Sequence, residues 1–273
     1  MTIAKVIQNT TKKFKAAGIP SAKLDAELLL AHTINKNREY LITHDDQVLT
    51  DSEIARFNQY ASRRLNREPV CYITNKLEFY GINFYVDNRV LSPRVETELI
   101  VEQVIKHAPK DSRLIDIGTG SGAIAIAIAQ HRADLHIIAT EVSQGALDVA
   151  KLNATKLLGN NHHLNFVLAD LFEGIDGQFE TVVTNLPYVS KDYLPQMKPE
   201  VQKEPAIALF GGAGDGLDLY RKFYKQLPSH IQAGSRVYHE SDPWQHDALN
   251  QLAKQARLKP ILEDYLILGF EKV

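Results

Sequence analysis

This sequence predicts an α/β chain with a small helical domain, a β-hairpin and a larger domain built on a parallel sheet. Amphipathic segments occupy the first 67 residues, and a stretch rich in β-branched and aromatic residues follows them. From residue 113 onwards, short apolar strands alternate with helical segments, which is typical of a parallel sheet covered on both faces. At 273 residues the chain is long enough for two unequal domains, each with its own core.

The helical domain is predicted over residues 1–69. Ser21 can cap a helix, and apolar residues recur after it at helical spacing: Leu24, Leu28 and Ala31. Residues 51–65 form a second amphipathic segment. Three arginines near its end fit a solvated helix terminus better than a contact with RNA: Arg63, Arg64 and Arg67.

A β-hairpin linker is predicted over residues 70–92. Glu68 and Pro69 end the helical region, because proline lacks the N–H that a helix interior needs. The alternating β-branched and aromatic residues that follow predict two strands that turn near residues 75–76 or at Gly81.

Residues 93–273 are predicted as the α/β domain. Its apolar strands are expected at 113–117, 136–140, 165–169, 179–184 and 236–240. Helices are expected at 123–130 and 143–158, between the first three of these strands.

Composition excludes several classes of protein. No window approaches the roughly 18 apolar residues of a membrane helix, and residues 1–18 lack the pattern of a secretion signal. The single cysteine, Cys71, rules out an internal disulfide and favours a cytoplasmic location. The formal net charge of −2 predicts no nucleic-acid surface, and the histidines show no metal-ligand spacing, so no metal site is expected.

A Gly-rich turn follows the first strand of the α/β domain. Asp116 lies in the strand, and the turn and its neighbours are the first candidate cofactor-binding residues: Gly118, Thr119, Gly120, Ser121 and Gly122. Glycines let a backbone turn tightly and approach a ligand, and in an open α/β sheet this turn lies where ligands bind. No Gly-Lys-Ser/Thr ends it, so it is not a phosphate-binding P-loop. A dinucleotide and S-adenosylmethionine both remain open.

Acidic residues end the next two strands. Glu141 lies 19 residues after Gly122, where a carboxylate can accept hydrogen bonds from both ribose hydroxyls, as it also does in NAD enzymes. Asp170 is placed to accept from an adenine amino group, and Leu171 beside it is a further candidate for binding the cofactor.

The tetrapeptide after the fourth strand distinguishes a methyltransferase from a dehydrogenase: Asn185, Leu186, Pro187 and Tyr188. An amide nitrogen is a poor nucleophile because its lone pair is delocalised. The Asn185 side-chain oxygen and the Leu186 carbonyl can accept both of its N–H bonds and hold the nitrogen in line with a methyl donor. Pro187 stiffens the turn, and the Tyr188 ring can stack on a flat substrate group. Catalysis would then rest on proximity and electrostatic placement, and Asn185 would serve both the cofactor and the substrate.

The whole chain resembles the release factor glutamine methyltransferase family (HemK/PrmC). The matching segments are residues 24–30 (LDAELLL), 68–69 (EP), 78–81 (EFYG), 91–98 (LSPRVETE), 116–122 (DIGTGSG), 170–172 (DLF), 185–188 (NLPY), 204–205 (EP), 211–216 (GGAGDG) and 220–221 (YR). This resemblance implies a helical N-terminal domain that recognises the substrate, a hairpin linker and a Rossmann-like class I methyltransferase domain. It implies S-adenosyl-L-methionine as the cofactor and the glutamine of the Gly-Gly-Gln loop in class 1 peptide-chain release factors as the substrate.

The chain departs from the family pattern in three places. Leu186 stands where the family usually has proline, Val95 interrupts the usual Pro-Arg-Pro segment, and residues 238–242 read YHESD near a usual Glu-Ile-Gly. The proposed chemistry uses only the carbonyl of residue 186, so leucine is compatible with it. Arg94 and Glu98 fit either the mouth of a substrate site or a surface salt bridge.

Two other classes of function compete with this interpretation. An adenine-N6 methyltransferase acting on RNA or DNA also uses an Asn-x-Pro-Tyr tetrapeptide, but the charge balance and the N-terminal matches make nucleic acid the weaker substrate hypothesis. No separate domain for flipping a base is evident either. A noncatalytic module with a nucleotide-binding fold is the second alternative, against which the intact glycines and acids argue.

Overall fold

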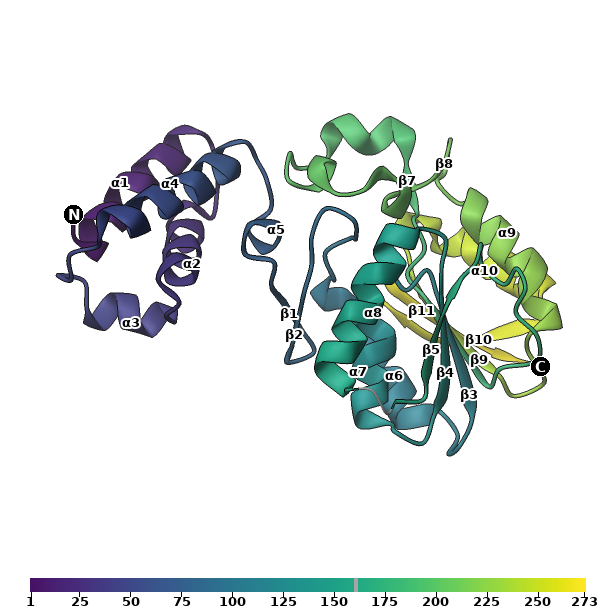
Figure 1. Cartoon of the computed structure of the whole chain (residues 1–273). Coiled ribbons are helices and arrows are strands. Elements are labelled where there is room, and N and C mark those ends of the chain that lie inside the picture. The colour runs from purple at the N-terminus through teal and green to yellow at the C-terminus, as the bar shows by residue number, and fades with distance from the viewer. Residues whose placement is uncertain (160–161) are drawn as a thin grey trace. The chain divides into compact units, whose positions relative to one another are not determined.

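The N-terminal part of the chain is helical in the computed structural model, which describes residues 1–159 and 162–273. Its helices are α1 (Ile3–Ala16), α2 (Ala22–Ile34), α3 (Arg38–Thr43), α4 (Asp51–Leu65) and α5 (Val70–Thr74). Residues Met1–Lys76 and Lys198–Lys203 form one compact unit, and Leu77–Met197 and Glu204–Val273 form the other (Figure 1). No helix among the described residues is long and apolar enough to cross a membrane.

Helix α2 buries a different face from the one we predicted. Ser21 occupies its N-cap position without a side-chain capping bond. Leu24 and Leu28 are exposed, whereas the predicted Ala31 is buried together with Ala22, Ala26, Leu29 and Leu30. Apolar residues surround much of this helix, so periodicity alone could not choose the face, and packing against α1 and α4 decided it.

Helix α4 has the predicted bounds, and a capping box between Thr50 and Glu53 fixes its start. The interpretation of its arginines as a solvated end is correct for the exposed Arg63 but wrong for Arg64. Arg64 is buried and pairs with Asp25 at 2.7 Å and with Glu200 at 2.9 Å. The pair with Asp25 joins α4 to α2, and the pair with Glu200 holds the segment Lys198–Lys203 in the helical unit.

The hairpin is shorter than predicted. Residues Val70–Thr74 form the helix α5 rather than a strand, because Tyr72 and Ile73 are buried and their β propensity yields to tertiary packing. Strands β1 (Leu77–Phe79) and β2 (Ile82–Phe84) pair antiparallel. Of the two predicted turns, the one at Gly81 (φ 72°) is confirmed, and Asn75 (φ 52°) instead ends α5.

The second unit is built on a seven-stranded sheet ordered β10-β11-β9-β6-β3-β4-β5. Its strands are β3 (Arg113–Ile117), β4 (His136–Glu141), β5 (Leu164–Leu168), β6 (Thr181–Thr184), β9 (Arg236–Glu240), β10 (Leu258–Asp264) and β11 (Ile267–Lys272). The five predicted strands are present, with shifted ends in β4, β5 and β6. The sheet is mixed rather than parallel throughout, because β11 runs antiparallel to both β9 and β10.

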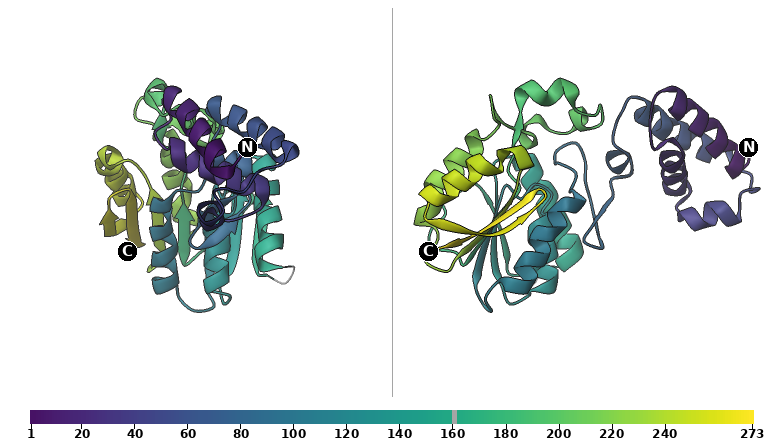
Figure 2. Two further views of the ribbon diagram at one scale, coloured as in Figure 1. Left: turned by 90° about the vertical axis from the view of Figure 1, so that its left-hand side faces the viewer. Right: turned by 180° about the vertical axis from the view of Figure 1, so that it is seen from behind.

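Helices cover both faces of this sheet. Figure 1 shows α6 (Glu98–His107), α7 (Ala123–His131) and α8 (Gln144–Leu158) on one face, with α9 (Asp218–Gln226) and α10 (His246–Gln255) on the other, and Figure 2 shows the same layers from behind. Short elements complete the unit: η1 (Val95–Thr97), β7 (Val189–Ser190), η2 (Lys191–Gln196), η4 (Ala206–Ala208), β8 (Phe210–Gly212), η5 (Leu227–Ser229) and η6 (Pro243–Gln245), while η3 (Val201–Lys203) belongs to the helical unit.

The arrangement confirms a Rossmann-like α/β domain and predicts where its ligand binds. The chain passes from β3 to β4 on one side and later returns to β6 on the other side of β3. Such a reversal opens a crevice at the carboxyl ends of the strands, where open α/β sheets bind their ligands.

Candidate active site

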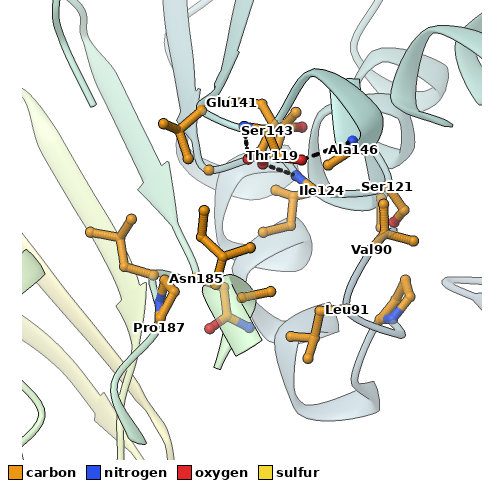
Figure 3. Close-up of a pocket in the computed structure, with 18 of the residues that line it drawn as sticks. Val90, Leu91, Thr119, Ser121, Ile124, Glu141, Ser143, Ala146, Asn185 and Pro187 are labelled. Carbon is orange, nitrogen blue, oxygen red and sulfur yellow. Dashed lines mark hydrogen bonds between the residues drawn. The ribbon is translucent and has the colours of Figure 1, made fainter. Parts of the chain in front are cut away.

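A cavity of about 310 Å³ lies beside the carboxyl ends of β3, β4 and β6. This volume falls at the lower end of the range for small-molecule sites. Its apolar lining includes Leu91, Pro93, Ile124, Val142, Leu171 and Ile207. In Figure 3, Glu141 and Ser143 lie at one end of this cavity, and Asn185 and Pro187 lie at the other.

The Gly-rich turn borders the cavity through its main chain. The amides of Gly118 and Thr119 both donate to the carbonyl of Thr140 at 2.9 Å, which ties the turn to the end of β4. Gly120 has a φ of 56°, and a Cβ placed on it would meet nothing within 4 Å. At this position glycine therefore serves the left-handed backbone and leaves space beside it.

Gly122 is required for a different reason. A Cβ there would lie 2.8 Å from the Ile126 side chain and 3.3 Å from that of Ala150, in addition to a φ of 81°. Gly122 lies outside the cavity lining and lets α7 approach α8 closely.

Asp116 holds the Gly-rich turn through a buried hydrogen bond. It is fully buried, and the Thr119 hydroxyl donates to its Oδ2 at 2.6 Å. Burial, more than any other cause, raises the pKa of Asp116 to about 7. Like Gly122, Asp116 does not line the cavity, whereas the other predicted residues of the turn do.

Glu141 presents a fixed carboxylate to the cavity. It accepts hydrogen bonds from the amides of Gly120 at 2.9 Å and Ser143 at 3.0 Å. A carboxylate has about four acceptor sites, so these two bonds leave capacity for the hydroxyls of a ligand.

Asp170 and Leu171 line the cavity after β5. Asp170 forms an ion pair with Lys222 of α9, a partner that the sequence did not suggest. Leu171 is buried and has a φ of 57°, an unusual conformation for a bulky residue and a feature often found at functional sites.

The same cavity is lined by the three residues that follow β6: Asn185, Leu186 and Pro187. The Leu186 side chain is buried and packs close to Gly118. The Asn185 amide nitrogen donates to the Thr97 hydroxyl at 3.2 Å. This hydrogen bond directs the NH2 group of Asn185 toward Thr97, so the Oδ1 atom of Asn185 remains as the acceptor.

Tyr188 does not line the cavity. Its hydroxyl donates to the buried Glu240 at 2.9 Å, and its carbonyl accepts from Gln245 at 2.9 Å. Burial, followed by the charge of Glu240, raises the pKa of Tyr188 above its usual value. The structure thus gives this side chain an anchoring contact, and stacking on a substrate stays a prediction.

The second Gly-rich segment, residues 211–216, explains how the tetrapeptide is held. A Cβ on Gly211 would lie 2.5 Å from the Pro187 carbonyl oxygen, and one on Gly216 would lie 2.2 Å from that of Tyr188. Strands β7 and β8 pair at the same place. Only glycine allows these two backbones to approach so closely.

Residues 89–97 supply part of the lining that we did not assign from the sequence. Thr97 is one of them, whereas Arg94 was already a candidate for the mouth of a substrate site or a surface salt bridge. Arg94 donates to the buried Glu204 at 2.8 Å, so it forms a salt bridge and borders the cavity at once. Glu98 instead accepts from the amide of Tyr80 at 2.7 Å. The resemblance of residues 91–98 to the family was the sequence signal that could have identified this part of the cavity lining.

Within residues 1–159 and 162–273, no group of three or more His, Cys, Asp or Glu side chains is placed to hold a metal ion.

Comparisons with known proteins support a methyltransferase. A family model described as the PrmC N-terminal domain matches residues 5–74, and one described as the methyltransferase small domain matches residues 94–201. The chain is 37% identical to the release factor glutamine methyltransferase of Koribacter versatilis, over 86% of this chain and 84% of that protein. It is 36% identical to the one of Geobacter sulfurreducens, over 85% and 81%. A solved methyltransferase from Pyrococcus furiosus shares the fold, with a TM-score of 0.52 at 16% identity over 71% of this chain and 90% of that one.

Proposed function

The chain belongs to the release factor glutamine methyltransferase family, and we propose that it methylates the glutamine of the Gly-Gly-Gln motif in a class 1 peptide-chain release factor. It is an S-adenosylmethionine-dependent methyltransferase. The methyl group goes to the side-chain amide nitrogen of that glutamine. The placement of Asn185 and the Gly-rich turn around one cavity supports methyl transfer to an NH2 group, and the observation that carries the choice of a release factor is the match of residues 5–74 to the PrmC N-terminal domain.

The residues at the Glu141 end of the cavity fit S-adenosylmethionine. The free acceptor sites of Glu141 suit the two ribose hydroxyls, and the open space beside Gly120 admits a ligand close to the main chain. Asp170 and Leu171 would hold the adenine, and Asp116 and Gly122 would maintain the turn. When bound, this cofactor supplies an electrophilic methyl group on a sulfonium sulfur.

The residues at the other end suit a primary amide. The Nδ2 atom of Asn185 donates a hydrogen bond to Thr97, so its Oδ1 atom can accept a hydrogen bond from one substrate N–H. The carbonyl of Leu186 can accept the second. Two fixed acceptors orient the nitrogen and favour the positive charge that develops as the methyl group leaves the sulfonium sulfur. The methylated nitrogen then loses one of its two protons to water, and no strong base is needed because a positively charged amide nitrogen is strongly acidic. Pro187 keeps the turn that presents both acceptors.

The helical domain, residues 1–69 in our assignment, is proposed to help hold the release factor, with residues 70–92 as the linker and 93–273 as the methyltransferase domain. The match of residues 5–74 to the PrmC N-terminal domain supports this division of roles. The proposal places the protein in the cytoplasm, where translation terminates.

An adenine nitrogen is the alternative acceptor of the methyl group. The cavity geometry alone does not distinguish the two, because adenine N6 also carries an NH2 group beside a π-system. The family membership favours the protein substrate, as does the N-terminal match.

Labelled S-adenosylmethionine would test the proposal directly. The protein is incubated with a class 1 release factor, with the same factor carrying Gln→Ala in its Gly-Gly-Gln motif, and with ribosomal RNA. We expect label only in the unaltered factor, on the glutamine located by peptide mass spectrometry. Label in the RNA, or equal label in both factors, would contradict the proposal.

A further inference from the structure

Glu240 is a buried carboxylate behind the Asn185 end of the cavity. It ends strand β9, and only 2% of its surface is exposed. Its Oε2 atom accepts from the Thr97 hydroxyl at 2.5 Å, and its Oε1 atom accepts from the Tyr188 hydroxyl at 2.9 Å. Glu240 does not line the cavity, so it acts through these neighbours and through a hydrogen bond that it accepts from the Asn185 side chain.

The hydrogen bonds from Glu240 to Asn185 have a fixed direction. A carboxylate has no proton to donate, so Thr97 must give its single hydroxyl proton to Glu240. The Thr97 oxygen is then left as an acceptor, and the group facing it on Asn185 must be the NH2. Consequently the Oδ1 atom of Asn185 is directed to another partner.

A second set of hydrogen bonds joins the end of β9 to the tetrapeptide at residues 185–188. The Tyr220 hydroxyl donates to the main-chain oxygen of Glu240 at 2.5 Å and accepts from the amide of Leu186. The end of β9 therefore holds the tetrapeptide at Asn185, at Leu186 and at Tyr188. Such fully paired buried networks confer rigidity.

We propose that Glu240 is a positioning residue that sets the orientation of the Asn185 carboxamide, with Oδ1 available to the substrate amide. This inference rests on the proposed function. A neutral amide at position 240 could donate to the Thr97 oxygen, and Thr97 could then donate to Asn185. That reversal would favour a flipped Asn185, whose NH2 group would face the N–H bonds of the substrate and repel them.

The charge state of Glu240 makes the proposal sensitive to pH. Burial, as the largest cause, raises the pKa of Glu240, and the bonds from Thr97, Tyr188 and Asn185 oppose that rise. The other groups that face it are Glu96 on η1, which raises the pKa further, and Tyr220 on α9. Protonation removes the obligatory acceptor, so the turnover number should fall as the pH falls through this raised pKa.

Glu240→Gln tests the proposal with little change of shape. We expect kcat to fall by on the order of 100-fold, while the Kd for S-adenosylmethionine and the KM for the release factor change less than about threefold. The matched control is Glu180→Gln. Glu180 precedes β6 at the opposite end of the sheet and accepts from Arg113 and Gln232 there, so its loss should leave kcat unchanged.

Thr97→Val supplies an independent break in the same chain of hydrogen bonds. We expect it to lower kcat as Glu240→Gln does, and the double variant should be no worse than either single one, because both remove one unit. The pH profile gives a readout that a purely structural role would not move: the acidic fall of kcat should disappear in Glu240→Gln.

The outcomes separate the two proposals. Wild-type protein that labels no release factor would overturn the proposed function. A wild type that labels the factor, with Glu240→Gln equally active, would overturn the role of Glu240. A Glu240→Gln protein that loses S-adenosylmethionine binding together with kcat, while Thr97→Val stays fully active, would also overturn it.

Discussion

The two ends of the cavity are built in different ways. One end is formed by residues 118–121 and Glu141, and we call it the loop end. Its shape is held mainly by hydrogen bonds from main-chain amides and by the glycines of the turn. At the end formed by Thr97 and residues 185–187, the Asn185 end, a series of side chains fixes one functional group. Main-chain N–H donors remain when a side chain is substituted. A series of side-chain hydrogen bonds, in contrast, is broken when any one of its members is replaced. Substitutions at the Asn185 end should therefore act mainly on turnover, and those at the loop end on affinity.

Asn185→Ala should produce the largest effect. It removes the Oδ1 acceptor but no contact of the Gly-rich turn, so kcat should fall on the order of 100- to 1000-fold. Asn185→Asp keeps an acceptor and should retain partial activity. Steady-state kinetics with a release factor, and calorimetry with S-adenosylmethionine, measure the two quantities. Asn165→Ala, at an exposed position of β5, is the control. Near-full turnover in Asn185→Ala would show that this residue is not part of the reactive site.

Glu141→Ala should act on affinity instead. It removes the carboxylate proposed to hold the ribose, so S-adenosylmethionine should bind roughly 1.5–3 kcal/mol more weakly, the scale for hydrogen bonds to a charged group. Saturating cofactor should restore much of kcat. Glu173→Ala is the matched control, because that exposed carboxylate does not line the cavity. Tight NAD binding to the wild type in the same calorimeter would instead reverse the cofactor assignment.

Asp116 gives the loop end a pH-dependent stability. Its pKa is about 7 in the folded protein against an ordinary value of 3.8, so folding takes up a proton between these values. Stability should therefore fall as the pH rises through this range, by up to about 1.4 kcal/mol per pH unit. Asp116→Asn should reduce this slope. Urea unfolding followed by circular dichroism, without ligand, at several pH values measures it; an identical slope in the variant would refute the assignment to Asp116.

Leu186→Pro should produce the smallest change in turnover, because the proposed contact uses only the carbonyl of residue 186. The structure indicates that this substitution nevertheless costs stability. Leu186 is buried, and its amide bonds the Tyr220 hydroxyl. Proline lacks that amide, so a stability loss of about 1 kcal/mol is expected. Thermal unfolding and kcat should separate the two effects; a large loss of kcat at unchanged stability would mean that Leu186 itself contacts the substrate.

Much of the molecule followed from local sequence. Apolar periodicity predicted α4, and apolar runs predicted the five strands, because both patterns depend on neighbours in the chain. The Gly-rich turn, Glu141, Asp170 and Asn185 followed from their positions at strand ends, since parallel strands bring those ends to one edge. These local rules located the cavity and the part of its lining at the strand ends.

Only the tertiary structure decided the rest. Periodicity could not choose the buried face of α2, nor could β propensity exclude a helix at α5, because packing overrode both. The antiparallel course of β11 depended on how the chain returns to the sheet. Above all, Thr97, Asn185 and Glu240 are far apart in sequence, and no local pattern links them. Hydrogen-bond direction is a property of assembled neighbours, so only the fold shows which atom of Asn185 is left as an acceptor.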